Sequence, residues 1–114
     1  MESCPFCRIV QGQGTARVLF STDDVIAFHD IAPHAPVHVL VIPRRHVTSL
    51  ALSTPEDRDL LGTLLLAAAD AARRAGIADS GFRVVTNSGR GAGQTVPHLH
   101  FHVLGGRPLA WPPG

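Results

Sequence analysis

The sequence predicts an α+β fold, in which a five-stranded antiparallel sheet is accompanied by one long and one short helix. Three observations indicate this class. Short apolar runs are separated by polar or proline-containing turns, one long stretch has helical periodicity, and the order along the chain is strands, helix, strands. The chain has 114 residues, of which 45% are hydrophobic. One domain over residues 1–114 is therefore expected.

The first third of the chain carries three predicted strands. Residues 18–20 and 25–28 are apolar runs joined by a polar turn. Residues 30–36 contain two prolines and are predicted to form a loop. Residues 37–42 are β-branched and apolar, which favours a third strand. A short helix is predicted near the N-terminus, over residues 6–10.

The long helix has clear signals at both ends. Thr54 can cap it, Pro55 suits its first position, and Asp57 stands where the acidic residue of a capping box belongs. Gly76 is a suitable stop. The residues predicted to share its buried face are Leu60, Leu61, Leu64, Leu65, Ala68 and Ala72.

The last third of the chain is predicted to return to the sheet. Residues 82–86 and 98–104 form the fourth and fifth strands, and residues 89–93 form a glycine-rich loop between them. The chain then ends in a proline-rich tail without regular structure.

Composition and charge exclude several classes of protein. The net charge is +1, so no strong field recruits nucleic acid or a membrane surface. The start of the chain is neither basic nor followed by an apolar stretch, and the longest apolar runs are too short to span a bilayer. We expect a cytoplasmic protein with reduced thiols, and no nucleic-acid or membrane partner.

Three histidines alternate in the predicted fifth strand. Side chains of a strand alternate between faces, so His98, His100 and His102 share one face, with successive residues roughly 7 Å apart along the backbone. Three interpretations follow: a polar solvent-facing surface, a metal held by neighbouring histidines, or a phosphate site in which one imidazole attacks phosphorus. The preceding glycine-rich loop allows close backbone approach and offers amide and hydroxyl groups, which favours the phosphate site.

The run Gly93-Gln94-Thr95-Val96-Pro97-His98-Leu99-His100-Phe101-His102-Val103-Leu104 resembles the signature of the histidine-triad superfamily. The similarity covers nearly the whole chain. Residues 28–36 resemble the family's nucleoside loop, and residues 38–46 resemble its central strand. Residues 104–107 and the ending Trp111-Pro112-Pro113-Gly114 are similar to the Hint branch. The resemblance therefore implies the histidine-triad fold.

The same resemblance implies a function and a set of site residues. Hint proteins are homodimers that bind purine mononucleotides and hydrolyse phosphoramidates of nucleoside monophosphates and related acyl adenylates, without an organic cofactor. The middle histidine, here His100, is the nucleophile, and His38 lies behind it for proton handling. Asp30 holds the ribose hydroxyls and Ile31 lines the base pocket. The residues around the phosphate are Asn87, Gly93, Gln94, Thr95 and His102.

Residue chemistry is consistent with this function. A neutral imidazole is a competent nucleophile at neutral pH, and fixed donors can stabilise the charge of the transferring phosphoryl group. Thr95 stands where the Hint branch more usually has serine, which leaves the leaving-group preference open. Two other functions stay open: a dinucleoside polyphosphate hydrolase, and a nucleotide-binding interaction module with little turnover.

Cys4-Pro5-Phe6-Cys7 has two interpretations. A redox dithiol of this form normally follows a strand, and too few residues precede Cys4 to form one. The alternative is half of a zinc site, for which His46 and His98 can supply the other two ligands. Some bacterial Hint relatives resemble this arrangement. The resemblance implies a structural zinc on Cys4, Cys7, His46 and His98, whereas a pair of free thiols remains the other possibility.

Overall fold

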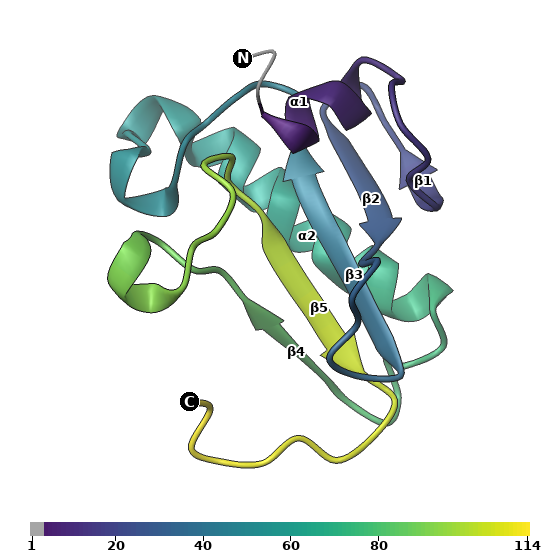
Figure 1. Cartoon of the computed structure of the whole chain (residues 1–114). Coiled ribbons are helices and arrows are strands. Elements are labelled where there is room, and N and C mark those ends of the chain that lie inside the picture. The colour runs from purple at the N-terminus through teal and green to yellow at the C-terminus, as the bar shows by residue number, and fades with distance from the viewer. Residues whose placement is uncertain (1–3) are drawn as a thin grey trace.

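The computed structural model describes residues 4–114 and contains the predicted antiparallel sheet (Figure 1). Its strand order is β1-β2-β3-β5-β4, and every neighbouring pair is antiparallel. The strands are β1 (Val18–Ser21), β2 (Val25–His29), β3 (Val37–Pro43), β4 (Phe82–Val85) and β5 (Phe101–Gly105). The α+β class is confirmed.

The two helices cover opposite faces of this sheet (Figure 1). Helix α2 (Arg58–Arg74) packs on one face, in a core that includes Val39, Val41 and Val103. The short helix α1 (Pro5–Val10) lies on the other face, in a smaller core with Phe28 and Leu40. Within the described residues, neither helix is long and apolar enough to cross a bilayer.

Helix α2 begins slightly later than predicted. Residues Pro55–Asp57 form a 3-10 turn, η2, and the Thr54 N–H donates to the Asp57 carboxylate, 2.9 Å away. The predicted face is wrong at Leu65, which is 52% exposed. The buried face is instead Leu64, Ala67, Ala68, Ala71 and Ala72. Alanines on this face let the helix axis approach the sheet closely, so the apolar face is set by small residues as much as by leucines.

Strand β5 begins at Phe101, three residues later than the sequence predicts. Its ladder with β3 starts at the pair Val41 and Phe101. The preceding polar groups bond outside the ladder: the Leu99 N–H donates to the carbonyl of Val47, and the His98 ring to that of Pro43. Even so, Leu99, Phe101 and Val103 all enter the core beneath α2. The predicted alternation of side chains is therefore confirmed, although part of it lies outside the strand.

Two further 3-10 turns complete the chain. Turn η1 (Leu50–Leu52) follows β3, and η3 (Arg90–Ala92) lies within the glycine-rich loop. Gly89 and Gly93 flank η3 with positive φ angles of 89° and 83°, a conformation that side chains disfavour. This loop brings Thr95 and the histidines after it to the face that carries α1.

Candidate functional site

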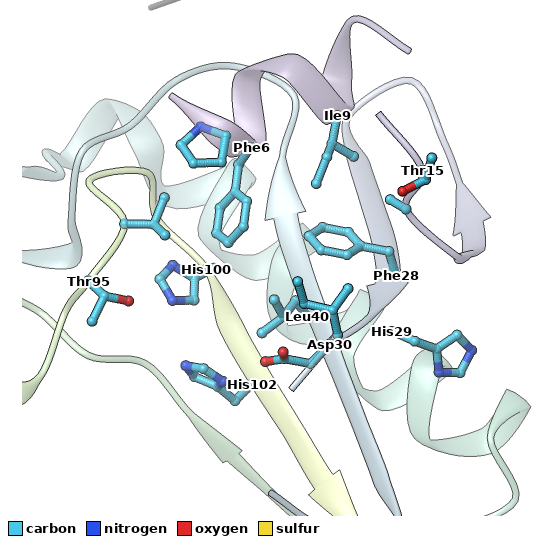
Figure 2. A pocket seen from close by; sticks show the side chains of 14 residues that line it. Phe6, Ile9, Thr15, Phe28, His29, Asp30, Leu40, Thr95, His100 and His102 are labelled. Carbon is cyan, nitrogen blue, oxygen red and sulfur yellow. The ribbon is translucent and has the colours of Figure 1, made fainter. Parts of the chain in front are cut away.

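A cavity of about 370 Å³ opens on the face of the sheet that carries α1 (Figure 2). Apolar side chains from α1, β2 and β3 line one part of it, and Thr95, His100 and His102 lie together in another part. Its lining residues are Pro5, Phe6, Ile9, Thr15, Ala16, Phe28, His29, Asp30, Ile31, Leu40, Thr95, Val96, His100 and His102. An apolar slot with a few convergent polar groups is typical of small-molecule sites.

His100 presents one ring nitrogen to this cavity. Its Nδ1 lies 2.8 Å from the carbonyl oxygen of His98, and a carbonyl can only accept, so Nδ1 carries the proton. The lone pair of the neutral ring is therefore on Nε2. The ring is buried and meets the edge of Phe6, with ring centres 5.1 Å apart. The hydrogen bond to the His98 carbonyl thus assigns the lone pair of the neutral His100 ring to one defined atom, Nε2.

His102 lies beside His100, with ring centres 5.0 Å apart. Burial, together with the neighbouring His100 and His38, lowers the pKa of His102 to about 4. His102 Nδ1 is 2.8 Å from His38 Nε2, which also lies 3.3 Å from the Asp30 carboxylate. The family resemblance implies that His38 lies behind His100, and in the structure its ring contacts that of His102. We call His38, His100 and His102 the histidine row.

Asp30 and Ile31 lie at the mouth of the cavity. Asp30 Oδ1 accepts the N–H of Ala32 at 2.8 Å, which orients the carboxylate. The Ile31 side chain is 95% exposed although it borders the cavity. Both residues follow directly on β2, so the strand end positions a charged group and an apolar group at one rim.

The glycine-rich loop is braced by its own side chains. The Gln94 amide donates to the carbonyls of Thr48 and Val96, and its oxygen accepts the N–H of Gly89. Asn87 donates to the carbonyl of Ala92 at 2.8 Å. Both side chains are therefore engaged in holding the loop, whereas Thr95 borders the cavity. Asn87, Gly93 and Gln94 are not among the residues that line it.

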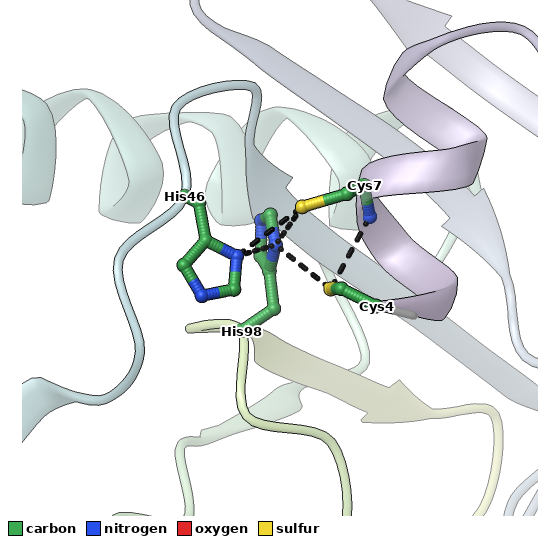
Figure 3. Close-up of side chains that lie close together, drawn as sticks. All are labelled: Cys4, Cys7, His46 and His98. Carbon is green, nitrogen blue, oxygen red and sulfur yellow. Dashed lines mark hydrogen bonds between the residues drawn. The ribbon is translucent and has the colours of Figure 1, made fainter. Parts of the chain in front are cut away.

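Cys4, Cys7, His46 and His98 come together beside α1 (Figure 3). One ligand atom from each residue lies within 4.8 Å of all the others. We call these four residues the Cys/His cluster. Cys7 Sγ is 3.2 Å from His46 Nδ1 and 3.5 Å from His98 Nδ1. The two Nδ1 atoms are 3.1 Å apart, and Cys4 Sγ is 3.4 Å from His98 Nδ1.

These distances suit one tetrahedral ion. With Zn–N near 2.0 Å and Zn–S near 2.3 Å, the edges of the tetrahedron are roughly 3.3 to 3.8 Å. The His98 Nε2–H donates to the carbonyl of Pro43, 2.9 Å away, which leaves Nδ1 with the lone pair that a metal needs. Burial also lowers the pKa of His98, which favours the neutral ring. The residues present therefore fit a metal ion with four protein ligands.

The apolar wall of the cavity was not identified from the sequence. The sequence does not mark Phe6 as a cavity residue, because an apolar residue between two cysteines is expected to belong to the core. Phe28 and Leu40 do carry a weak signal, since alternation along their strands places them on the histidine face once the pairings of β2 with β3 and of β3 with β5 are known. The two cysteines, His100 and His102, by contrast, were identified by residue type and spacing, and His38 by the family resemblance.

Comparison with known proteins gives a consistent result. A family model described as HIT domain matches residues 11–109. An uncharacterized HIT-like protein of Synechocystis is 49% identical over 113 residues, which cover 99% of this chain and 98% of that protein. The crystal structure of a HIT family hydrolase from Legionella pneumophila has a TM-score of 0.96 and 42% identity, over 98% of this chain and 100% of that chain. A histidine triad protein from Clostridium difficile has a TM-score of 0.93 and 35% identity, over 96% of each chain.

Proposed function

This chain belongs to the HIT family, and on that premise we propose that it binds purine nucleoside monophosphates and hydrolyses their phosphoramidates and acyl adenylates. One observation carries the proposal. The carbonyl of His98 holds the proton of His100 on Nδ1, which leaves the Nε2 lone pair in a cavity with an apolar slot at one side. A nucleophile beside a slot of this kind suits a substrate with a planar base and a reactive phosphorus.

The proposed reaction has two displacements at phosphorus. His100 Nε2 forms a bond to phosphorus, the bond from phosphorus to the amine breaks, and the amine leaves with a proton delivered through the imidazoles. Water then attacks phosphorus, the bond to Nε2 breaks, and the nucleoside monophosphate is released. The remaining proton of the water replaces the one that the imidazoles gave to the amine, and the electron pair of the broken bond returns to His100 Nε2, so the neutral ring is regenerated.

The remaining site residues divide between base, ribose and phosphate. The apolar slot and Ile31 would hold a purine, and Asp30 would accept hydrogen bonds from the ribose hydroxyls. His102, Thr95 and the main chain at Gly93 would surround the phosphate. Asn87 and Gln94 would act through the loop that they brace, because their side chains already bond within it.

Hydrolysis of adenosine 5′-phosphoramidate and of a diadenosine polyphosphate, measured side by side, tests this function. We expect the phosphoramidate to be the better substrate, and rapid-quench mass spectrometry to find a nucleotidyl group on His100. Faster cleavage of the polyphosphate would assign the chain to that hydrolase activity. Tight nucleotide binding with no cleavage of either compound would indicate a binding module.

We also propose that the Cys/His cluster holds a structural zinc. Four protein ligands leave no open position for substrate, so the ion would tie α1 to the sheet rather than take part in the chemistry. The reduced cytoplasm, where we place the protein, keeps both thiols available. Elemental analysis of protein purified without chelators should find about one zinc per chain. A content below about a tenth of an equivalent would leave Cys4 and Cys7 as free thiols.

A homodimer is the third proposal. β4 is an edge strand of the sheet, and Phe82 at its start is 37% exposed. Leu65 and Leu66 on α2 are also exposed, at 52% and 72%. An open sheet edge and exposed apolar side chains each favour pairing with a second copy. Sedimentation should show a dimer whose dissociation is promoted by Leu66→Asp, and a monomer at all concentrations would contradict the proposal.

A further inference from the structure

The loop between β2 and β3 places a main-chain N–H against a buried ring of the histidine row. The N–H of His34 donates to His38 Nδ1, 3.0 Å away. We propose that this amide is a positioning group, which fixes the tautomer of His38 and through it makes His102 an N–H donor toward the substrate phosphate. The substrate part of this inference rests on the proposed function, whereas the tautomers are a property of the free protein.

The first step concerns His38. A main-chain amide can only donate, so Nδ1 of His38 must be the acceptor. His38 is buried, at 4% exposed, and burial lowers its pKa, so the ring is neutral at neutral pH. A neutral imidazole carries one proton. That proton is therefore on Nε2.

The second step concerns which nitrogen of His102 carries its proton. The Nε2–H of His38 faces His102 Nδ1 at 2.8 Å, with the Asp30 carboxylate at 3.3 Å as a second acceptor. If His102 donated instead, His38 would have to carry its proton on Nδ1, where it would face the hydrogen of the His34 amide. The chain of hydrogen bonds therefore runs in one direction. It leaves the single proton of His102 on Nε2, the nitrogen available to the cavity that His102 lines.

Opposite tautomers then stand side by side. The carbonyl of His98 places the proton of His100 on Nδ1, and the amide of His34 places that of His102 on Nε2. One ring offers a lone pair and its neighbour a donor, with centres 5.0 Å apart. The other tautomer of His102 would turn a lone pair toward an anionic phosphate, which repels it. Donors aimed at developing charge are among the largest contributions to catalysis.

The position of the His34 amide is itself held by the surrounding chain. Arg107 donates to the carbonyl of His34 at 2.9 Å. Pro33 and Pro36 restrict the loop on either side. The His34 ring is exposed, and its centre is 5.7 Å from that of His38. It is the main-chain N–H of His34, rather than its imidazole, that donates the hydrogen bond to His38.

Nitrogen-15 NMR of the ring nitrogens in the wild-type protein tests the inference directly. We expect the Nε2–H tautomer for His38 and His102, and the Nδ1–H tautomer for His100, at neutral pH. Finding His102 or His38 predominantly as the Nδ1–H tautomer overturns the inference. This measurement needs no substrate and no variant.

A matched pair of variants separates the amide from the side chain. His34→Ala keeps the main-chain N–H, so we expect it to keep the wild-type tautomers. His34→Pro removes the N–H, so we expect a mixture of His102 tautomers and a kcat lower than that of His34→Ala by about 10- to 100-fold, with a smaller change in KM. A folded His34→Pro protein with wild-type tautomers and kcat overturns the inference. If His34→Pro does not fold, the wild-type spectrum decides.

The outcomes also separate this inference from the proposed function. If the protein shows the expected tautomers but does not hydrolyse phosphoramidates, the proposed function is contradicted, whereas the structural role of the His34 amide is supported. If the protein hydrolyses phosphoramidates efficiently while His102 is in the opposite tautomer, the inference about the amide is contradicted, whereas the proposed function is supported.

Discussion

The Cys/His cluster and the histidine row draw on the same five-residue segment, residues 98–102, yet they are built in opposite ways. In the cluster, ligand atoms from four residues face one another and Cys4 is only 5% exposed. In the row, the Nδ1 atoms of His100 and His102 are hydrogen-bonded within the protein, and each ring directs its other nitrogen toward an open cavity. The first arrangement suits stability and the second suits chemistry.

The two histidines face different sites because each donates a hydrogen bond from a different ring nitrogen. His98 donates from Nε2 to the carbonyl of Pro43, which leaves Nδ1 for a metal. His100 donates from Nδ1 to the carbonyl of His98, which leaves Nε2 for a substrate. Two residues of one type, two positions apart, thus serve different sites because main-chain carbonyls select different nitrogens.

Removing the nucleophile should produce the largest effect. We expect His100→Ala to lower phosphoramidate turnover on the order of 10³-fold or more, because no other group offers a lone pair at that position. Nucleotide binding should persist, since the apolar slot is retained. Steady-state kinetics and calorimetric titration with adenosine monophosphate measure the two quantities. Turnover within a few-fold of the wild type would remove His100 from the role of nucleophile.

Removing the metal should act mainly on stability. A tightly held ion that binds only the folded state contributes about 4 kcal/mol at a thousand-fold excess over its Kd. Chelation should therefore lower the melting temperature of the wild-type protein. A Cys4→Ser/Cys7→Ser protein should already melt at the lower temperature and not respond to the chelator. An equal response in both proteins would show that the chelator acts elsewhere.

The same experiment tests how separate the two regions are. Helix α1 carries Cys7, with Cys4 at its N-cap, and also Phe6 and Ile9 of the cavity wall. A six-residue helix is not stable by itself. We expect nucleotide affinity to fall by a few-fold on chelation, and bound nucleotide to raise the affinity for the metal by the same factor, by reciprocity. Stability should still change more than the turnover of the folded fraction.

Sequence reasoning succeeded where one local rule was sufficient. Alternation placed His98, His100 and His102 on one face, and residue type singled out Cys4 and Cys7, which the structure brings together with His46 and His98. The predicted start of β5 was wrong because His98 and Leu99 donate hydrogen bonds to the carbonyls of Pro43 and Val47 rather than to a neighbouring strand. No local sequence pattern encodes the tertiary positions of these two carbonyls.

The contact between His38 and His102 required knowledge of the strand order. In the β3–β5 ladder, Leu40 pairs with His102 and His38 pairs with Leu104. His38 and His102 are therefore diagonal neighbours on one face. Without the pairing of these two strands, which lie far apart in the sequence, His38 could be assigned to either histidine of the row. Family resemblance alone placed it behind His100.

The low pKa of His102 predicts a pH dependence of stability that His102→Asn should remove. An unfolded histidine has a pKa near 6.5, so between pH 6.5 and about 4 the unfolded state binds more protons. Stability from the neutral ring is therefore complete above pH 6.5 and is lost as the pH falls toward 4. We expect urea unfolding of the wild type to lose on the order of 1 to 2 kcal/mol more than His102→Asn over this range. Because both proteins keep the cluster, parallel pH profiles would count against a buried, neutral His102.

The smallest expected effect is at the open rim, where Ile31 contrasts most with the buried cluster. Its side chain is 95% exposed in the free protein, so Ile31→Ala removes almost no buried contact and should change stability by less than about 0.5 kcal/mol. A purine in the slot would cover part of this side chain. Losing that contact should weaken nucleotide binding by about 1 kcal/mol, or roughly 5-fold.

Leu52→Ala is the matched control, because Leu52 is 67% exposed and lies outside the cavity lining. Calorimetric titration of both variants with adenosine and guanosine monophosphates measures the difference. Equal affinities in the two variants would show that the base does not reach Ile31, and would place it deeper, against Phe6 and Phe28.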